Sequence, residues 1–188
     1  PHFGERIARH WMDVVRYTDT YGYEWDPVAV GSWEYRDYLI RAFNDDIGYD
    51  QLIREQIAGD LLPHPRINKK QQINESLIGP MFYHLGEHRH GASVNFNGIH
   101  QEMIDNKIDA FSKTFLAMTV ACARCHDHKY DPIPIADYYS LFSIFDSSAE
   151  KRVSLGEADI GGEKYQKQLK ELRDKYADTF AKHRQAAS

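Results

Sequence analysis

The sequence contains only two cysteines, too few for the disulfide framework of a small secreted scaffold or for a four-cysteine zinc site. It also lacks an excess of basic residues. The formal net charge is -5, so the positive field that attracts nucleic acid is missing. No apolar run approaches the roughly 20 residues that a membrane-spanning helix needs. Alternating strand patterns are almost absent. These absences favour a soluble helical domain with no nucleic-acid partner and no membrane span in this segment.

Hydrophobic residues recur at helical spacing along most of the 188-residue chain, which predicts an all-α fold class with an irregular set of helices. We expect one domain over 1–150, followed by a linker and an amphipathic, charged helix within 151–188. The chain starts at Pro1 without a methionine or a leader, so we expect it to be processed or a piece of a longer domain. The predicted helices before residue 80 cover 5–17, 32–43, 49–57 and 73–78, with Ser32 as the N-cap of the second.

A fifth predicted helix carries the most information. Its apolar positions step by four and three from Ile104 to Cys125 without a break, which places both cysteines on the stripe that faces the core. The prolines after Asp131 end this helix, and another begins near Tyr138. Before the fifth helix, the stretch 84–98 has no period and is predicted to be a long loop.

The two cysteines lie in the string CARCHDHKYDPI, where Cys122 and Cys125 are followed at once by His126. Cys-x-x-Cys-His is the pattern of c-type haem attachment, in which both thiols bind the haem and the histidine ligates the iron. On a helix, positions i, i+3 and i+4 share one face, so the three side chains would project together. The motif therefore predicts one covalent haem c, with His126 as the proximal iron ligand.

Three other interpretations of the motif stay open. Cys122, Cys125, His126 and His128 are of the residue types that bind zinc, although zinc sites usually consist of two separated pairs. A dithiol redox pair is the second alternative, although such pairs usually lie at a helix N-terminus and this motif ends a predicted helix. The third is a pair of buried structural cysteines. We favour haem over all three.

A second axial ligand must come from another segment, because a helix along one face of a porphyrin cannot reach the other face. Met118 and His128 are excluded for this reason. A continuous helix would place His100 roughly 39 Å from His126, which is too far for both to bind one iron. Five-coordinate iron is the alternative. The candidates that remain are His10, Met12, Met81, His84, His88 and His90, among which we single out His10 and His88.

Basic residues are candidates for binding the haem propionates, because carboxylates favour guanidinium and ammonium groups. We expect this role for Lys129, which adjoins the motif, and for Arg16 and Arg36. The alternative for these residues is an ordinary surface ion pair, which contributes little to stability.

Four segments carry a family resemblance: ERIARHWMDVVRYTDTYGYE, WEYRDYLIRAFNDD, REQIAGD and CARCHDHKYDPIPIADYYSLFSIF. Together they resemble a domain of unknown function, numbered 1549, from secreted planctomycete proteins. There it typically lies between a planctomycete cytochrome c domain and a further C-terminal domain. The resemblance covers 1–145 and implies a periplasmic or secreted location, haem attachment outside the cytoplasm and a role coupled to electron transfer. The positions that match family motif residues are His10, Asp13, Arg16, Arg36, Asp37, Cys122, Cys125, His126, His128 and Lys129.

These observations predict a single-haem c-type cytochrome domain that exchanges electrons with a partner protein or a fused domain. One alternative is a haem enzyme whose open distal face, lined by His10, Asp13 and Arg16, activates a peroxide or oxidises a carbohydrate-derived substrate. The other is a zinc-stabilised module without redox activity.

Overall fold

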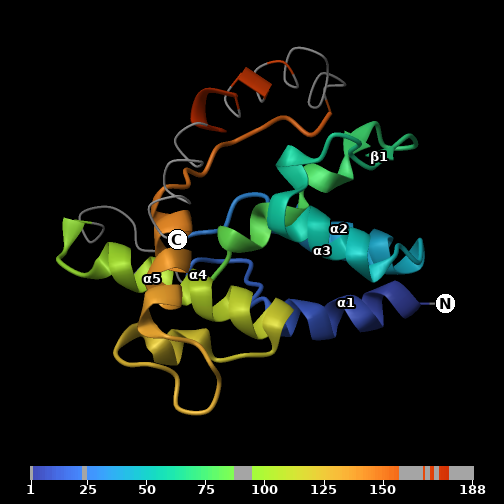
Figure 1. Cartoon of the computed structure of the whole chain (residues 1–188). Coiled ribbons are helices and arrows are strands. Elements are labelled where there is room, and N and C mark those ends of the chain that lie inside the picture. Colours follow the sequence, from blue (N-terminus) through green and yellow to red (C-terminus); the bar gives the residue numbers. More distant parts are fainter. Residues whose placement is uncertain are drawn as a thin grey trace. The chain divides into compact units, whose positions relative to one another are not determined.

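A computed structural model describes residues 2–22, 25–86 and 95–156, together with residues 167, 170, 171 and 174–177. These residues are mostly helical, in agreement with the predicted fold class (Figure 1). The α-helices are α1 (Phe3–Val14), α2 (Ser32–Asn44), α3 (Tyr49–Ala58), α4 (Ile99–Leu116) and α5 (Ile135–Asp146). The 3-10 helices are η1 (Gly59–Leu61), η2 (Glu75–Leu77), η3 (Gly79–Tyr83) and η5 (Val120–Arg124), and the strands are β1 (Ile67–Asn68) and β2 (Ile73–Asn74).

The chain divides into two compact units, each made of two separate stretches of sequence. The first unit contains Pro1–Ile53 and Met81–Arg152, and the second contains Arg54–Pro80 and Val153–Ser188. The expected division into a domain over 1–150 and a tail over 151–188 stays a prediction. Near the C-terminus, the described residues between 167 and 177 are helical. No helix in the described part of the chain combines the length and apolar character needed to cross a membrane.

The first unit begins with the packed pair α1 and α2. A small residue on α1 permits their close approach, since a Cβ at Gly4 would overlap the carbonyl oxygen of Ile40. The Gly4 N–H donates to Asn44 Oδ1 at 2.9 Å. On α1, Gly4 and Ala8 are buried, whereas Val14 is exposed. The buried residues of α2 include Tyr35, Tyr38, Leu39 and Ala42.

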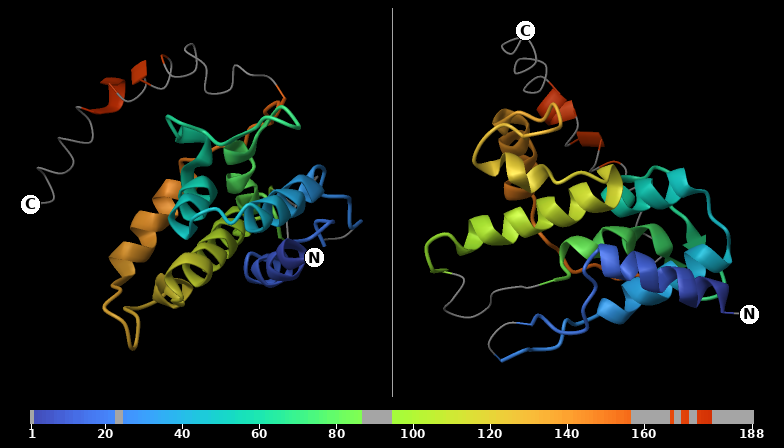
Figure 2. Two further views of the ribbon diagram at one scale, coloured as in Figure 1. Left: turned by 90° about the vertical axis from the view of Figure 1, so that its right-hand side faces the viewer. Right: turned by 90° about the horizontal axis from the view of Figure 1, so that it is seen from below.

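A second core of the same unit joins α4, η5 and α5. Ile104 and Ile108 of α4, Val120 and Ala123 of η5 and Tyr138 of α5 form one buried cluster. The three elements contact one another, with α5 crossing α4 near the turn that carries η5 (Figure 2). The turn that carries the Cys-x-x-Cys-His motif therefore packs against this hydrophobic core.

The predicted continuous fifth helix is wrong. Helix α4 ends at Leu116, where Ala117 adopts the left-handed conformation at φ 53, and the chain turns before η5 begins. The cysteines therefore do not extend the core stripe of α4: both are exposed. The break also removes the distance argument against His100 as an iron ligand.

The second unit corrects one further prediction about local structure. Residues 73–78 form no α-helix, because Ile73 pairs with Asn68 in an antiparallel ladder and η2 follows. A buried carboxylate, Glu55, accepts from Arg66 Nε and Nη2 at 3.0 Å each and so compensates the guanidinium charge.

In the first unit, the predicted N-cap is also wrong. Ser32 is the first helical residue of α2, and the N-cap position is occupied by Gly31 at φ 85. A left-handed backbone is adopted most readily by glycine, which lacks a Cβ. The chain therefore enters α2 through a glycine turn rather than through a side-chain cap.

Candidate functional site

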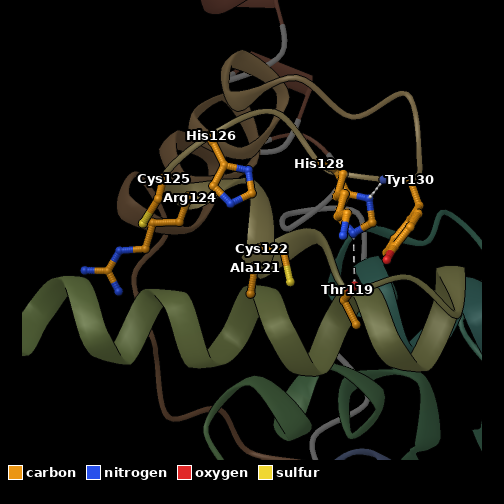
Figure 3. A pocket seen from close by; sticks show the side chains of 9 residues that line it. Thr119, Ala121, Cys122, Arg124, Cys125, His126, His128 and Tyr130 are labelled. Atoms are coloured by element: carbon orange, nitrogen blue, oxygen red, sulfur yellow. Dashed lines mark hydrogen bonds between the residues drawn. The ribbon is translucent and has the colours of Figure 1, made fainter.

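An open hollow of about 460 Å³ lies at the two cysteines. Its volume falls within the range of about 300–1,000 Å³ that is usual for ligand sites. All three residues of the Cys-x-x-Cys-His motif line it, together with Lys129. The lining residues are Thr119, Ala121, Cys122, Arg124, Cys125, His126, His128, Lys129 and Tyr130 (Figure 3).

The short 3-10 helix η5 explains why the two thiols lie on one side of the chain. Three residues make one turn of a 3-10 helix, so side chains at i and i+3 lie above one another. Cys122 and Cys125 have this spacing, and Cys125 continues η5 in a helical backbone conformation. Val120 and Ala123 have the same spacing and form the buried face. The thiols thus share a face, as α-helical spacing predicts, but that face is turned to solvent.

Arg124, which lies between the two cysteines, links η5 to α4 through its side chain and to α5 through its backbone carbonyl oxygen. Its Nη1 lies 3.4 Å from Asp105 Oδ2 on α4, and Tyr138 Oη of α5 donates to the other oxygen of Asp105 at 2.6 Å. Burial, followed by this hydrogen bond, raises the pKa of Tyr138. Tyr139 Oη donates to the Arg124 carbonyl oxygen at 3.3 Å. These contacts hold the thiol-bearing turn in a fixed position.

His126 presents one free ring nitrogen. Its Nδ1 lies 2.7 Å from the carbonyl oxygen of Asp127, and since a carbonyl only accepts, Nδ1 carries the proton. The lone pair of Nε2 is then available, and Nε2 has no hydrogen-bond partner among the described residues. Asp127 is itself fixed, because its Oδ1 accepts from the Ile135 N–H at 2.8 Å at the start of α5. A carbonyl-bound Nδ1–H is a common way to orient a metal-binding imidazole.

His128, two residues on, is a structural histidine in this arrangement. Its Nδ1 accepts from the backbone N–H of Tyr130 at 3.3 Å and of Asp131 at 2.9 Å, which requires an unprotonated Nδ1. The proton is therefore on Nε2, which donates to Thr119 Oγ1 at 3.1 Å. The side chain is only 6% exposed. The Asp131 carboxylate lies 3.2 Å from the same Nδ1. Both nitrogens of His128 are occupied, so it is not available as a ligand.

The arrangement fits a c-type haem better than a zinc ion. A zinc site needs three or four ligand atoms around one point, and no group of three or more His, Cys, Asp or Glu side chains that could hold a metal ion occurs in the described part of the chain. In a c-type haem only the imidazole binds iron, whereas the thiols bond to the porphyrin edge. Two exposed thiols, a free Nε2 and an open hollow meet that requirement.

Comparison with known families supports the resemblance seen in the sequence. The model of the family described as PSCyt2, protein of unknown function (DUF1549), matches residues 1–150. The chain belongs to this family. No curated protein and no solved structure matches the chain.

The structure brings only part of the predicted site of this DUF1549 chain together. Lys129 lines the hollow and lies 5.0 Å above the ring of Tyr130. Neither Arg16 nor Arg36 lines it, and Arg36 pairs with the adjacent Asp37 at 2.9 Å. Arg124, which was not among the predicted site residues, does line it. Its position between the two cysteines is the feature of the sequence that could have indicated this.

The proposed distal ligands do not line the hollow. His10 is an exposed residue of α1, and His88 and His90 fall outside the described residues. His100 Nε2 lies 2.7 Å from Asp146 Oδ1. The other candidates within the described ranges, Met12, Met81 and His84, are also absent from the lining. The described residues therefore supply no second axial ligand at the hollow.

His84 instead belongs to a separate hydrogen-bonded cluster. Tyr21 Oη lies 2.6 Å from its Nε2, and Glu150 Oε2 lies 2.5 Å from its Nδ1. The second oxygen of Glu150 accepts from Lys107 Nζ at 2.7 Å. Burial alone would raise the pKa of Glu150, but the hydrogen bonds from His84 and Lys107 outweigh it and lower the pKa to about 2.

This low pKa predicts a pH-dependent contribution to stability. The ionised carboxylate of Glu150 stabilises the folded state fully above the ordinary glutamate pKa of 4.5, and this contribution is lost as the pH falls towards 2. In denaturant titrations, the difference in free energy of unfolding between the native chain and Glu150→Gln should shrink between pH 5 and pH 2. Glu102→Gln, at an exposed carboxylate of α4, is the control. An equal pH dependence for both variants would contradict the role of Glu150.

Proposed function

We propose that this DUF1549 chain carries one covalently bound haem c at Cys122, Cys125 and His126 and transfers electrons. The observation that carries the proposal is the joint geometry of the motif. Two exposed thiols are aligned by η5, and His126, whose Nε2 is free, lines the same hollow. A haem bound there would supply one-electron chemistry through its iron.

The residues of the hollow have separate tasks in this proposal. Cys122 and Cys125 would hold the haem through thioether bonds, and His126 would bind its iron through Nε2, in the ring orientation that the Asp127 carbonyl oxygen fixes. Lys129 and Arg124 offer cationic groups to propionates at the rim. Arg16 and Arg36, which do not line the hollow, are not assigned this task.

Optical spectroscopy and mass spectrometry of the purified chain test the proposal. The protein should be produced in a host that attaches haem outside the cytoplasm. We expect a Soret band, a pyridine haemochrome spectrum of the thioether-linked type and a mass increase of one haem that survives denaturation. A colourless chain with two free thiols from the same host would exclude this function.

A second candidate function is a haem enzyme with an open distal face. The observation that favours it is that His126 is the one imidazole among the described lining residues with a free nitrogen, so the sixth position has no described ligand. Such a site would activate a peroxide or oxidise a carbohydrate-derived substrate. A high-spin spectrum that shifts with cyanide or carbon monoxide would support the enzyme, and a low-spin spectrum insensitive to both would support the electron carrier.

Location and partners follow from the same proposal. Covalent haem attachment outside the cytoplasm implies a periplasmic or secreted protein, and an electron carrier needs a redox partner protein or a fused redox domain. The net charge of -5 gives no support to a nucleic-acid partner.

A further inference from the structure

Arg16 occupies a position that is unusual for an arginine. It lies just after α1, where the Tyr17 N–H donates to the Met12 carbonyl oxygen at 2.9 Å and Arg16 itself has φ 54. This is a Schellman motif, and the residue in the left-handed conformation there is usually glycine. A side chain at such a position strains the backbone. The backbone conformation therefore does not explain why the residue at this position is an arginine.

The guanidinium of Arg16 is also poorly compensated. Nη1 donates to the carbonyl oxygen of Leu85, which is a neutral acceptor, and Nε is buried without a hydrogen-bond partner. No carboxylate of the described residues forms an ion pair with it, and the ionisable groups of Asp109 and Tyr35 act on it only from a distance. Burial lowers the pKa of Arg16 to about 10 and outweighs the opposing effect of those two groups.

The neighbouring backbone leaves room for this side chain. A Cβ at Gly86, whose φ is 94, would overlap the Arg16 guanidinium. Arg66 in the second unit shows how a compensated arginine of this chain is arranged, because its Nε and Nη2 both donate to Glu55 at 3.0 Å. In Arg16 the same Nε–Nη2 edge faces no carboxylate of the described residues. This edge is the fork that binds carboxylate and phosphate groups with two parallel hydrogen bonds.

We propose that Arg16 is the base of a second binding site, which takes a carboxylate, sulfate or phosphate group of a ligand through its Nε–Nη2 edge. The site is separate from the hollow at Cys122, because Arg16 is not among the residues that line that hollow. It does not depend on haem, so its test is independent of the proposed function. A bound oxyanion would supply the countercharge that the described residues do not.

Thermal unfolding of the whole chain tests this site with a matched control. Helix α2 ends in the same motif, in which the Ile47 N–H donates to the Ala42 carbonyl oxygen and exposed Asp46 has φ 49. In sodium chloride, Asp46→Gly measures the release of backbone strain alone. We expect Arg16→Gly to raise Tm further, by about 2–4 °C, because it also removes an uncompensated buried charge. A Tm below that of the native chain would overturn the proposal.

Titration with oxyanions provides the second arm. Acetate, sulfate and phosphate are compared with chloride at equal ionic strength, which separates the carboxylate from the sulfate and phosphate sources. The native chain and Asp46→Gly should gain Tm with at least one oxyanion, and Arg16→Gly and Arg16→Lys should lose this gain, since lysine lacks the fork. A general salting effect would stabilise all four proteins equally, and that result would exclude the site.

A direct measurement covers the case in which a variant fails to fold. In the native chain the buried Nε–H of Arg16 should give a resolved proton–nitrogen NMR signal. Its chemical shift should change and reach a plateau as the oxyanion that raises Tm is added. A signal that does not move over the titration would overturn the proposal.

Discussion

Replacing both Cys122 and Cys125 with alanine is expected to reduce covalently bound haem from one per chain to none. The sequence contains no other thiol, so no alternative attachment site exists. Both cysteines are exposed, and surface substitutions usually change stability by less than about 0.5 kcal/mol, so the double variant should still fold. The measurement is the mass of the denatured protein together with its pyridine haemochrome spectrum, and circular dichroism checks the fold.

The single variants and one control sharpen this test. Cys122→Ala and Cys125→Ala should each retain one thioether bond and give haemochrome spectra shifted from that of the native chain. Met118→Leu removes the sulfur of a neighbouring exposed residue that does not line the hollow, and its spectrum should be unchanged. Covalent haem in the double variant would show that attachment does not use these thiols and would exclude the proposed site.

Most of the helices could be predicted from hydrophobic spacing because their buried faces are continuous. Tyr35, Tyr38 and Leu39 are fully buried at the positions that the 3.6-residue period predicts for α2. Hydrophobic spacing gives a wrong prediction where the apolar residues of two successive elements keep the same period although the first helix has already ended. Phe115 and Cys122 continue the spacing of Ile108, although the chain leaves the helix at Ala117. The sequence places neither glycine nor proline there, so no local signal marks the break.

That the three motif residues line one hollow could be predicted from the sequence, but the residues around them could not. Three motif residues within five positions carry the haem hypothesis, and local backbone geometry is enough to bring them together. A propionate partner or a distal ligand must come from another segment, and spacing along the chain does not report which segments meet. Arg16 and Arg36 were chosen by residue type alone, and the structure places neither at the hollow. The structural role of His128 was also not visible in the sequence, because it depends on the backbone N–H groups of Tyr130 and Asp131 and on the hydroxyl of Thr119.

Replacing His126 with alanine should leave haem attached but change the coordination of its iron. The thiols are untouched, whereas the Nε2 ligand is lost, so we expect an altered spin state and a shifted reduction potential. Added imidazole should restore much of the native spectrum by occupying the vacated position. Stability of the fold should change little, because His126 is exposed and its only hydrogen bond within the described residues is to the adjacent Asp127. The measurements are absorption spectra with and without imidazole, and potentiometric titration.

His128→Ala is the matched control, because it removes a second imidazole of the same hollow with the opposite expected outcome. The variant leaves the Asp131 N–H and the Thr119 hydroxyl without their partner in a turn where His128 is 6% exposed, which should cost about 2 kcal/mol in the free energy of unfolding. Its haem spectrum should match that of the native chain. If His128→Ala changed the iron spectrum and His126→Ala did not, the ligand assignment would be wrong. The tautomer derived for His128 would then also be wrong, because a histidine whose Nδ1 and Nε2 are both hydrogen-bonded has no lone pair left for iron.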